Sequence, residues 1–252
     1  GKRTEICIYN EEMQKAPLLH YSHKLLAQFY QFVFFEDWRQ DVWSKRFVRD
    51  HVRYSDEIAC AAARVVAKLR EKARNNRKMG DNIHGIFDSM HVRRGDFLKV
   101  YHNTADLDAT ELYKYSSDEL SEGSTLFIAT DERKKSFFDP LKKHYEVFFL
   151  DDFRSELIGL NSHFFGMVDQ LVASRGRIFF GTFHSTLTNY ITRMRGYYAT
   201  KNKLNGHKAG TTRSFYFYPP EVKMTLQSYY PVSKPLWIRE FPAGWRDIDR
   251  GI

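Results

Sequence analysis

The chain has 252 residues, of which 42% are hydrophobic and 16% aromatic, and it carries a net charge of +8. This composition allows a substantial core and excludes an intrinsically disordered chain. The charge favours an anionic partner, and nucleic acid or a phosphorylated small molecule would satisfy it equally. No stretch reaches the roughly 20 apolar residues that cross a membrane, so we expect no stable membrane insertion. The first residues carry no signal-peptide pattern, so we expect no targeting segment in this chain.

The first 80 residues are predicted to be mainly helical after a short strand at residues 6–9. Ser55 can cap a helix whose first turn holds Asp56 and Glu57 and which Gly80 can stop. Apolar residues at helical spacing mark its buried face, at Ile58, Ala62, Val65, Val66 and Leu69.

From residue 86 onward, apolar strands alternate with helical segments. Strands are predicted at residues 86–92, 126–130, 146–150 and 177–180. Helices are predicted near 109–119, from 132 behind an Asp131 cap, over 163–175 and from Ser185 to about 195. The alternation predicts a parallel sheet with covered faces, so we expect a Rossmann-like domain over residues 81–252 and a helical region over 1–80. Residues 206–252, rich in proline, tyrosine and tryptophan, are expected to wrap over the body without regular structure.

The segment HVRRGDF, residues 91–97, lies where the first of these strands ends. Ligands of open parallel sheets bind at the carboxyl ends of the strands. Arg93 and Arg94 offer planar forks of donors that match phosphate oxygens, and Gly95 lets the backbone approach a ligand. An Arg–Asp pair that closes a turn through Asp96 explains the same residues, so both interpretations stay open.

The segment GTFHSTLTNYITRMRG, residues 181–196, combines a strand end with a helix start. Gly181 turns the chain, and the helix would point Ser185, Thr186 and free backbone N–H groups at whatever lies above the sheet. This is the outline of an anion site. The alternative is that Ser185 only caps its helix.

Asp169 lies among apolar residues of a predicted helix, in FFGMVDQLVASRG. A buried acid needs a partner. The carboxylate could accept hydrogen bonds from a guanine edge, and an ion pair with Arg175 is the alternative.

Other acidic and cysteine residues carry weaker signals. Asp247 and Asp249 have the spacing of a metal-binding pair, but no strand precedes them, so we favour a solvated or structural role and predict no metal site. Cys7 and Cys60 form no CxxC pair, so two free buried thiols are favoured over one disulfide.

Taken together, HVRRGDF, the acid of MVDQLVASRG and GTFHSTLTNYITRMRG follow in an order that resembles the GDP-fucose O-fucosyltransferase family. Related α1,6-fucosyltransferases carry a similar His-x-Arg-Arg segment. The tail YYPVSKPLWIREFPAGWRDID, residues 229–249, is similar to the ending of plant and algal-type members, and residues 18–70 resemble more weakly the segment that precedes the domain.

The resemblance implies a GT-B glycosyltransferase that inverts its sugar and needs neither metal nor cofactor. It implies that Arg93 contacts the β-phosphate of GDP and that Asp169 reads guanine. It further implies that Ser185 and Thr186 bind phosphate oxygens and that His91 and Asp96 orient the arginine loop. Leu187 is expected to pack near the nucleotide, at a position where the family usually has an aromatic residue. Arg94 is expected to add charge or to pair with Asp96.

The resemblance further implies transfer of fucose from GDP-fucose to a protein hydroxyl or a glycan, in the ER or Golgi of the secretory pathway. Members of the family usually have a glycine- and asparagine-rich acceptor-side loop, but no Gly-Asn segment occurs before residue 80. The chain is then either a piece of a longer protein or a member with a reduced first domain. A GDP-sugar-binding relative without activity is the first alternative function. A basic nucleic-acid-binding protein, suggested only by charge, is the second.

Overall fold

The computed structural model describes residues 8–9, 11–17, 34–35, 39–40, 43, 47, 51, 53–100, 106–183, 185–202, 213–217 and 224–225. By its internal contacts the chain divides into two units. The first comprises residues 1–53, 230–240 and 247–252, and the second comprises residues 54–229 and 241–246. In the first unit, β1 (Ile8–Tyr9) pairs in parallel with β2 (Phe34–Phe35), and a short helix, α1, spans Glu11–Lys15.

The second unit is built on a sheet whose described strands follow the order β5-β4-β3-β6-β7-β8. The strands are β3 (Asp88–Val92), β4 (Thr125–Thr130), β5 (Glu146–Phe148), β6 (Phe179–Thr182), β7 (Ser214–Phe217) and β8 (Met224–Thr225). The first five in this order are parallel, and β8 is antiparallel to β7. The order reverses between β3 and β6, which makes that pair the topological switch point of a Rossmann-like fold.

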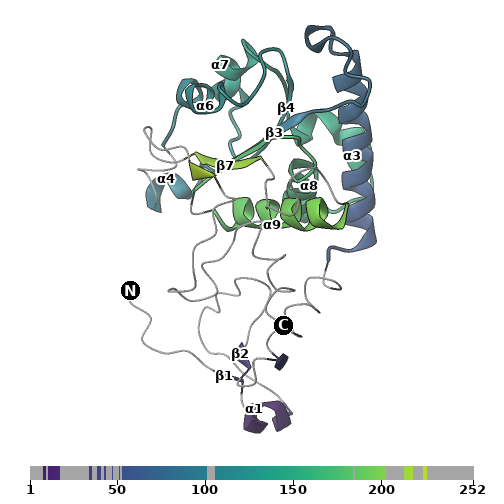
Figure 1. Cartoon of the computed structure of the whole chain (residues 1–252), viewed down its shortest axis with the longest axis vertical. Coiled ribbons are helices and arrows are strands. Elements are labelled where there is room, and N and C mark those ends of the chain that lie inside the picture. The colour runs from purple at the N-terminus through teal and green to yellow at the C-terminus, as the bar shows by residue number, and fades with distance from the viewer. Residues whose placement is uncertain are drawn as a thin grey trace. The chain divides into compact units, whose positions relative to one another are not determined.

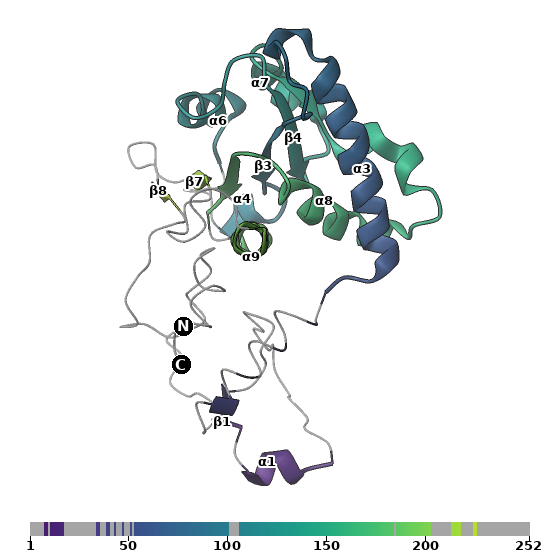
Figure 2. The same cartoon turned by 45° about the vertical axis from the view of Figure 1, so that its right-hand side comes forward.

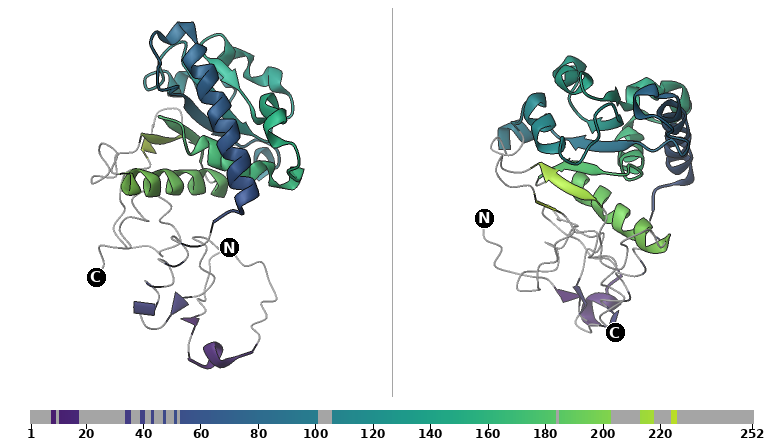
Figure 3. Two further views of the ribbon diagram at one scale, coloured as in Figure 1. Left: turned by 90° about the vertical axis from the view of Figure 1, so that its right-hand side faces the viewer. Right: turned by 45° about the horizontal axis from the view of Figure 1, so that its top comes forward.

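Helices cover both faces of this sheet (Figures 1 and 2). On one face lie α3 (Asp56–Asn75), α8 (Phe165–Ala173) and part of α9 (Thr186–Lys201), which bury one core with strand residues such as Phe127 and Phe179. On the other face lie α6 (Ala109–Ser116) and α7 (Asp139–Lys142), which bury a second core with Met90, Val92 and Ile128. Successive strand side chains point to opposite faces, so each strand feeds both cores. Figure 3 shows the long α3 lying across its face of the sheet.

Short helical segments connect these elements. They are η2 (Arg77–Met79), α4 (Phe97–Val100), η3 (Lys135–Phe138), η4 (Leu150–Leu157) and η5 (Ser162–Phe164). Because η3 and η4 are the next helical segments after β4 and β5, they place the chain above the carboxyl edge of the sheet.

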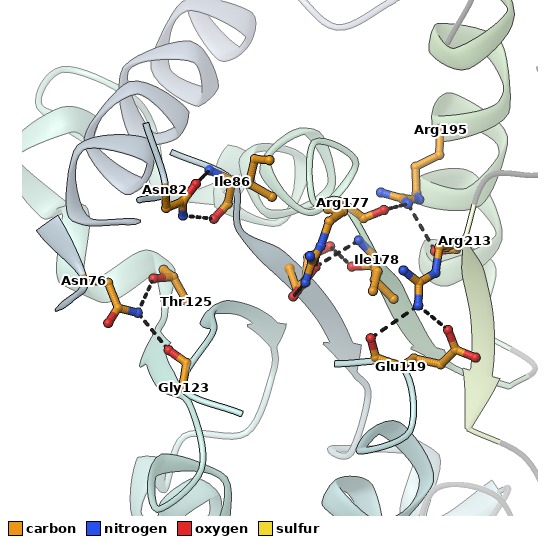
Figure 4. A network of polar contacts seen from close by, with 12 residues as sticks. Asn76, Asn82, Ile86, Glu119, Gly123, Thr125, Arg177, Ile178, Arg195 and Arg213 are labelled. Atoms are coloured by element: carbon orange, nitrogen blue, oxygen red, sulfur yellow. Dashed lines mark hydrogen bonds and ion pairs between the residues drawn. The ribbon is translucent and has the colours of Figure 1, made fainter. Parts of the chain in front are cut away.

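The edge at which the parallel strands begin, here called the amino edge, is closed by side-chain hydrogen bonds (Figure 4). Arg195, from α9, donates to Ser214 Oγ at 2.8 Å and to main-chain carbonyls that include Arg177 O at 2.9 Å. Arg177 in turn forms a bidentate ion pair with buried Asp88, in which Nε donates to Oδ1 at 3.0 Å and Nη2 donates to Oδ2 at 2.8 Å. Asn76 donates to Gly123 O at 2.8 Å and so holds the end of α3 against the start of β4. The charged side chains of Arg195, Arg177 and Asp88 at this edge are all engaged in hydrogen bonds or ion pairs.

The sequence predictions for the four strands between residues 86 and 180 and for the parallel sheet are confirmed, whereas other predicted elements need correction. No helix starts at residue 132: Thr130 Oγ1 accepts from Glu132 N at 3.0 Å, the carboxylate of Asp131 is bound elsewhere, and helical structure begins only with η3. The expected absence of regular structure after residue 206 is wrong for β7, because Phe215 and Phe217 extend the second core.

The helix predicted from Ser55 is confirmed as α3, but its cap is not, because the Ser55 side chain makes no capping hydrogen bond. The helix ends at Asn75, and Gly80, at φ +62°, follows η2 instead. Cys60 is free but exposed on α3, so the expected burial of its thiol is wrong. Cys7 lies outside the described residues, and the domain boundary at residue 80 stays a prediction.

Candidate functional site

The carboxyl edge, where the parallel strands end, is tied together at the switch point by Thr182 of β6. The backbone N–H of Arg93 donates to Thr182 Oγ1 at 2.9 Å, and that hydroxyl donates to His91 O at 3.2 Å. The end of β3 and the end of β6 are therefore joined directly. Ser185 comes three residues after Thr182, so the arginine loop and the start of α9 lead away from the same point.

The guanidinium of Arg93 lies between two carboxylates. Its Nη2 lies 2.6 Å from Asp96 Oδ1, in the same loop, and its Nη1 lies 2.8 Å from Asp131 Oδ2, at the end of β4. The guanidinium carbon of Arg93, Cζ, lies 5.5 Å from the centre of the Phe97 ring. With 31% of the side chain exposed, Arg93 is held in place and still reaches solvent.

Arg94 points to a different set of partners and is more deeply buried. Its Nε lies 3.1 Å from Glu132 Oε2, its Nη1 donates to Leu107 O at 3.0 Å, and its guanidinium stacks 4.0 Å from the Phe137 ring centre. The expected pairing of Arg94 with Asp96 is therefore wrong, because Asp96 pairs with Arg93. An Arg–Asp pair does close the turn, as one reading of the sequence held, and this geometry leaves the phosphate reading open.

Asp131 is the main residue that the sequence reading misplaced. Its Oδ1 accepts from the backbone N–H of Arg94 at 2.8 Å, while its Oδ2 faces Arg93. Gly95 has φ +21°, and a Cβ atom there would overlap Asp131 Oδ2. The sequence did contain a signal for this role of Asp131. The residue directly follows a buried strand, and the end of the neighbouring strand holds the two arginines.

His91 is a buried, uncharged residue beneath the arginine loop. Its side chain faces α9, where Nδ1 lies 2.6 Å from Thr188 Oγ1. Burial, reinforced by the charge of Arg93, lowers the pKa of His91 to about 3. Gly181 lets this contact form, because a Cβ at that position would overlap the Thr188 side chain. His91 thus joins β3 to α9 without adding charge.

The start of α9 presents two different hydroxyl groups. Ser185 is 2% exposed, and its Oγ lies 3.5 Å from Thr188 N, at the limit of a capping hydrogen bond. Thr186 is exposed, whereas Leu187 is half-buried and packs into the core that α9 shares with α3 and α8. The backbone N–H groups of this first turn lie beside the loop that follows β6.

Asp169 has a buried oxygen without a hydrogen-bond partner among the described residues, Oδ1. Burial raises the pKa of its carboxyl well above the usual range; the charge of Lys135 opposes this rise, and that of Asp151 adds to it. These two charges follow β4 and β5, so Asp169 faces the carboxyl edge. The alternative ion pair with Arg175 is not formed, because that guanidinium stacks 3.7 Å over the Tyr198 ring.

The described part of the chain offers neither a metal cluster nor a helical membrane span. There, no group of three or more histidine, cysteine or acidic side chains could hold a metal ion. No helix among these residues has the length and apolarity to cross a bilayer. The acid pair at residues 247 and 249 lies outside the described residues.

The fold and this edge define an α/β protein of the Rossmann-like kind, with an arginine, a helix start and an unpaired acid at the edge where such proteins bind ligands. Residues 5–198 match the family model described as GDP-fucose protein O-fucosyltransferase, and the chain belongs to that family. The resemblance predicted from the sequence is thereby confirmed. The match ends within α9, so the predicted likeness of the tail lies beyond it. No curated protein matches the chain. Membership suggests fucosyltransferase activity with GDP-fucose as donor.

Proposed function

We propose that the chain transfers fucose from GDP-fucose to a hydroxyl of a protein or a glycan, as an inverting, metal-independent GT-B enzyme that uses no cofactor. The family match supports the donor and the reaction class. The fold supports a donor site at the carboxyl edge of the second unit, where the strand order reverses.

The position of Arg93 is the observation that carries the proposal. It stands at the end of β3, its backbone bonded to Thr182 of β6, beside the loop that leads to the start of α9. Breaking the sugar–phosphate bond develops negative charge on GDP. A fixed guanidinium aimed at the β-phosphate would stabilise that charge, and one such donor is worth about 2.7–4 kcal/mol in the transition state.

The other site residues take supporting roles in this proposal. The carboxylate of Asp169 accepts hydrogen bonds from the guanine N1–H and N2–H₂ groups. Its Oδ1 is available for this contact because it has no partner among the described residues. Ser185 and Thr186, with the first-turn N–H groups of α9, bind phosphate oxygens. Leu187 packs near the nucleotide.

The arginine loop is held from three sides in the same proposal. His91 fixes the strand beneath it against α9, and Asp96 orients the guanidinium of Arg93. Arg94 contributes positive charge while its own partners, Glu132 and the Leu107 carbonyl, keep it in place.

Calorimetric titration with GDP, GDP-fucose and UDP tests the donor site. Selective binding of the two guanine nucleotides is expected, because uracil lacks the paired donors that Asp169 would accept. Equal binding of UDP and GDP would contradict the guanine contact. Strong salt-dependent binding of RNA without a response to GDP would instead favour a nucleic-acid-binding protein.

Release of GDP from GDP-fucose in the presence of candidate acceptors tests catalysis. Arg93→Ala is expected to lower the rate by about 10²–10³. Arg74→Ala removes an equal charge from the exposed end of α3 near the amino edge and serves as the control. Normal transfer by the Arg93 variant would end the assignment, and nucleotide binding without any transfer would favour a non-catalytic relative.

The proposal also names a compartment and partners. Enzymes of this family typically act in the secretory pathway, so we place the reaction in the ER or Golgi, with a protein or glycan as the acceptor. Localisation of the tagged native protein by microscopy tests this placement, and a cytosolic signal would contradict it.

A further inference from the structure

In the part of the chain that the structure describes, Asp131 contacts both arginines of the loop, and the proposed function gives it no role. It extends from the end of β4, the strand beside β3. Both of its carboxylate oxygens are used: Oδ1 accepts from the Arg94 backbone at 2.8 Å, and Oδ2 pairs with Arg93 Nη1 at 2.8 Å. One side chain therefore fixes the path of the loop and the direction of the guanidinium together.

Asp96 contacts the same guanidinium, but it is more exposed to solvent than Asp131. Its side chain is 71% exposed and belongs to the loop that it would have to orient, whereas the Asp131 side chain is 26% exposed and directly follows strand β4 of the sheet. Exposed ion pairs contribute little because water and salt screen them. The pair with Asp131 is better placed to restrict Arg93.

Gly95 adds independent evidence that the loop is fitted to this carboxylate. Its φ of +21° favours glycine, and a Cβ atom would overlap Asp131 Oδ2. The loop thus contacts the Asp131 carboxylate at position 95, where only glycine leaves room for the carboxylate.

We propose that Asp131 is the positioning residue of Arg93, holding the guanidinium toward the β-phosphate of the donor while Asp96 is an exchangeable partner. This inference rests on the proposed function, since it takes Arg93 to contact that phosphate. Nη1 and Nη2 each carry a second hydrogen beyond those given to the carboxylates, so the held guanidinium keeps donors for an anion. Pre-orientation spares the donor the cost of ordering a long side chain.

The test compares the dissociation constants of GDP and GMP, measured by calorimetry, because their ratio isolates the β-phosphate. In the wild-type protein GDP is expected to bind about 10- to 150-fold tighter than GMP, as a charge-assisted hydrogen bond predicts. Arg93→Ala should bring the ratio near one. Asp131→Asn, which keeps an acceptor for the Arg94 N–H but loses the charge, should bring it within about threefold of the Arg93 variant, with GMP binding unchanged.

Two matched variants decide between positioning and general damage. Asp96→Asn should retain most of the ratio, because its pair is exposed. Asp139→Asn, which removes an exposed carboxylate paired with Lys142 on α7, should leave it unchanged. A wild-type ratio in Asp131→Asn, or an equal loss in Asp96→Asn, would overturn the inference.

Gly95→Ala keeps the test decisive if Asp131→Asn does not fold. The added methyl group should displace the Asp131 carboxylate and lower the ratio without touching either arginine. An unchanged ratio in this variant would then reject the positioning role. If the wild-type protein binds GDP and GMP equally, or neither of them, the proposed function itself fails, which separates the two failures.

Discussion

The two edges of the same sheet hold their charges in opposite ways. At the amino edge, buried Arg195 donates to a hydroxyl and to four main-chain carbonyls, those of Ser174, Gly176, Arg177 and Arg213. At the carboxyl edge, Asp169 has a buried oxygen with no partner among the described residues, and Arg93 lies partly exposed between two carboxylates. Buried polar groups are normally satisfied. A saturated charge indicates structure, whereas a buried carboxyl oxygen on α8 without a partner, beside the ends of the parallel strands, indicates a place for a ligand.

The largest effect should come from the saturated edge. Arg195→Met leaves several buried carbonyls without a donor and should lower the free energy of unfolding by about 3–5 kcal/mol. The ratio of GDP to GMP affinity should not change in the folded protein. Urea unfolding measures the first quantity, with Arg175→Met, an exposed arginine stacked on Tyr198, as the control. A stable Arg195 variant would break the contrast between the edges.

Asp169→Asn should show the opposite combination. Because an amide, unlike a carboxyl whose pKa is raised by burial, has no charged form to lose on folding, the free energy of unfolding should rise near neutral pH. GDP affinity should fall about 10-fold or more, because an amide cannot accept from both guanine donors. Asp81→Asn, at an exposed loop position, is the control. Thermal unfolding with and without GDP gives both quantities. Loss of stability together with retained GDP affinity would make Asp169 structural.

The pH dependence of stability should reveal His91. Its pKa falls to about 3 in the folded protein, from an ordinary value of 6.5. Between these values the unfolded chain holds a proton that the folded chain lacks, so stability falls as the pH is lowered, by up to about 1.4 kcal/mol per pH unit. Asp169, with its raised pKa, acts with the opposite sign.

Urea unfolding of the wild type and His91→Asn at pH 6.5 and pH 5 isolates this contribution, because Asp169 is common to both proteins. The stability difference between the two proteins should shrink by roughly 2 kcal/mol over this interval. Parallel slopes in the two proteins would show that folding does not lower the pKa of His91.

The smallest stability effect should come from Ser185. Its weak capping contact predicts that Ser185→Ala costs less than about 0.5 kcal/mol, while GDP affinity falls. Asp108 is the matched case, because it caps α6 with two short hydrogen bonds in a complete capping box, and Asp108→Ala should cost about 1 kcal/mol without affecting GDP. A larger stability loss in the Ser185 variant would mark it as a simple cap.

The local patterns in the sequence were sufficient for four strands of the sheet, β3 to β6. Apolar runs such as residues 126–130 have the length and composition typical of a buried strand, and the structure confirms them. They placed Arg93 at a strand end correctly. The likeness of separated motifs to one family was also sufficient for the family itself.

The partners of the charged residues could not be predicted in the same way. Arg93 and Arg94 are adjacent, yet they pair with Asp131 and Glu132, which follow the neighbouring strand β4, and only the register of β3 against β4 decides this. Asp131 also satisfies the local pattern of a helix cap, and a tertiary contact overrode that pattern. The strand at residues 214–217 was missed because its aromatic residues occur in a segment rich in turn formers.

The hydroxyl of Thr182 has a consequence for turnover. It receives the Arg93 N–H and donates to the carbonyl of His91, whose ring contacts Thr188 on α9. The arginine loop and the first turn of α9 are therefore joined through one set of hydrogen bonds, and they cannot separate without breaking some of them. In an enzyme that must let GDP leave after each cycle, the opening motion would then belong to elements outside this hydrogen-bonded set.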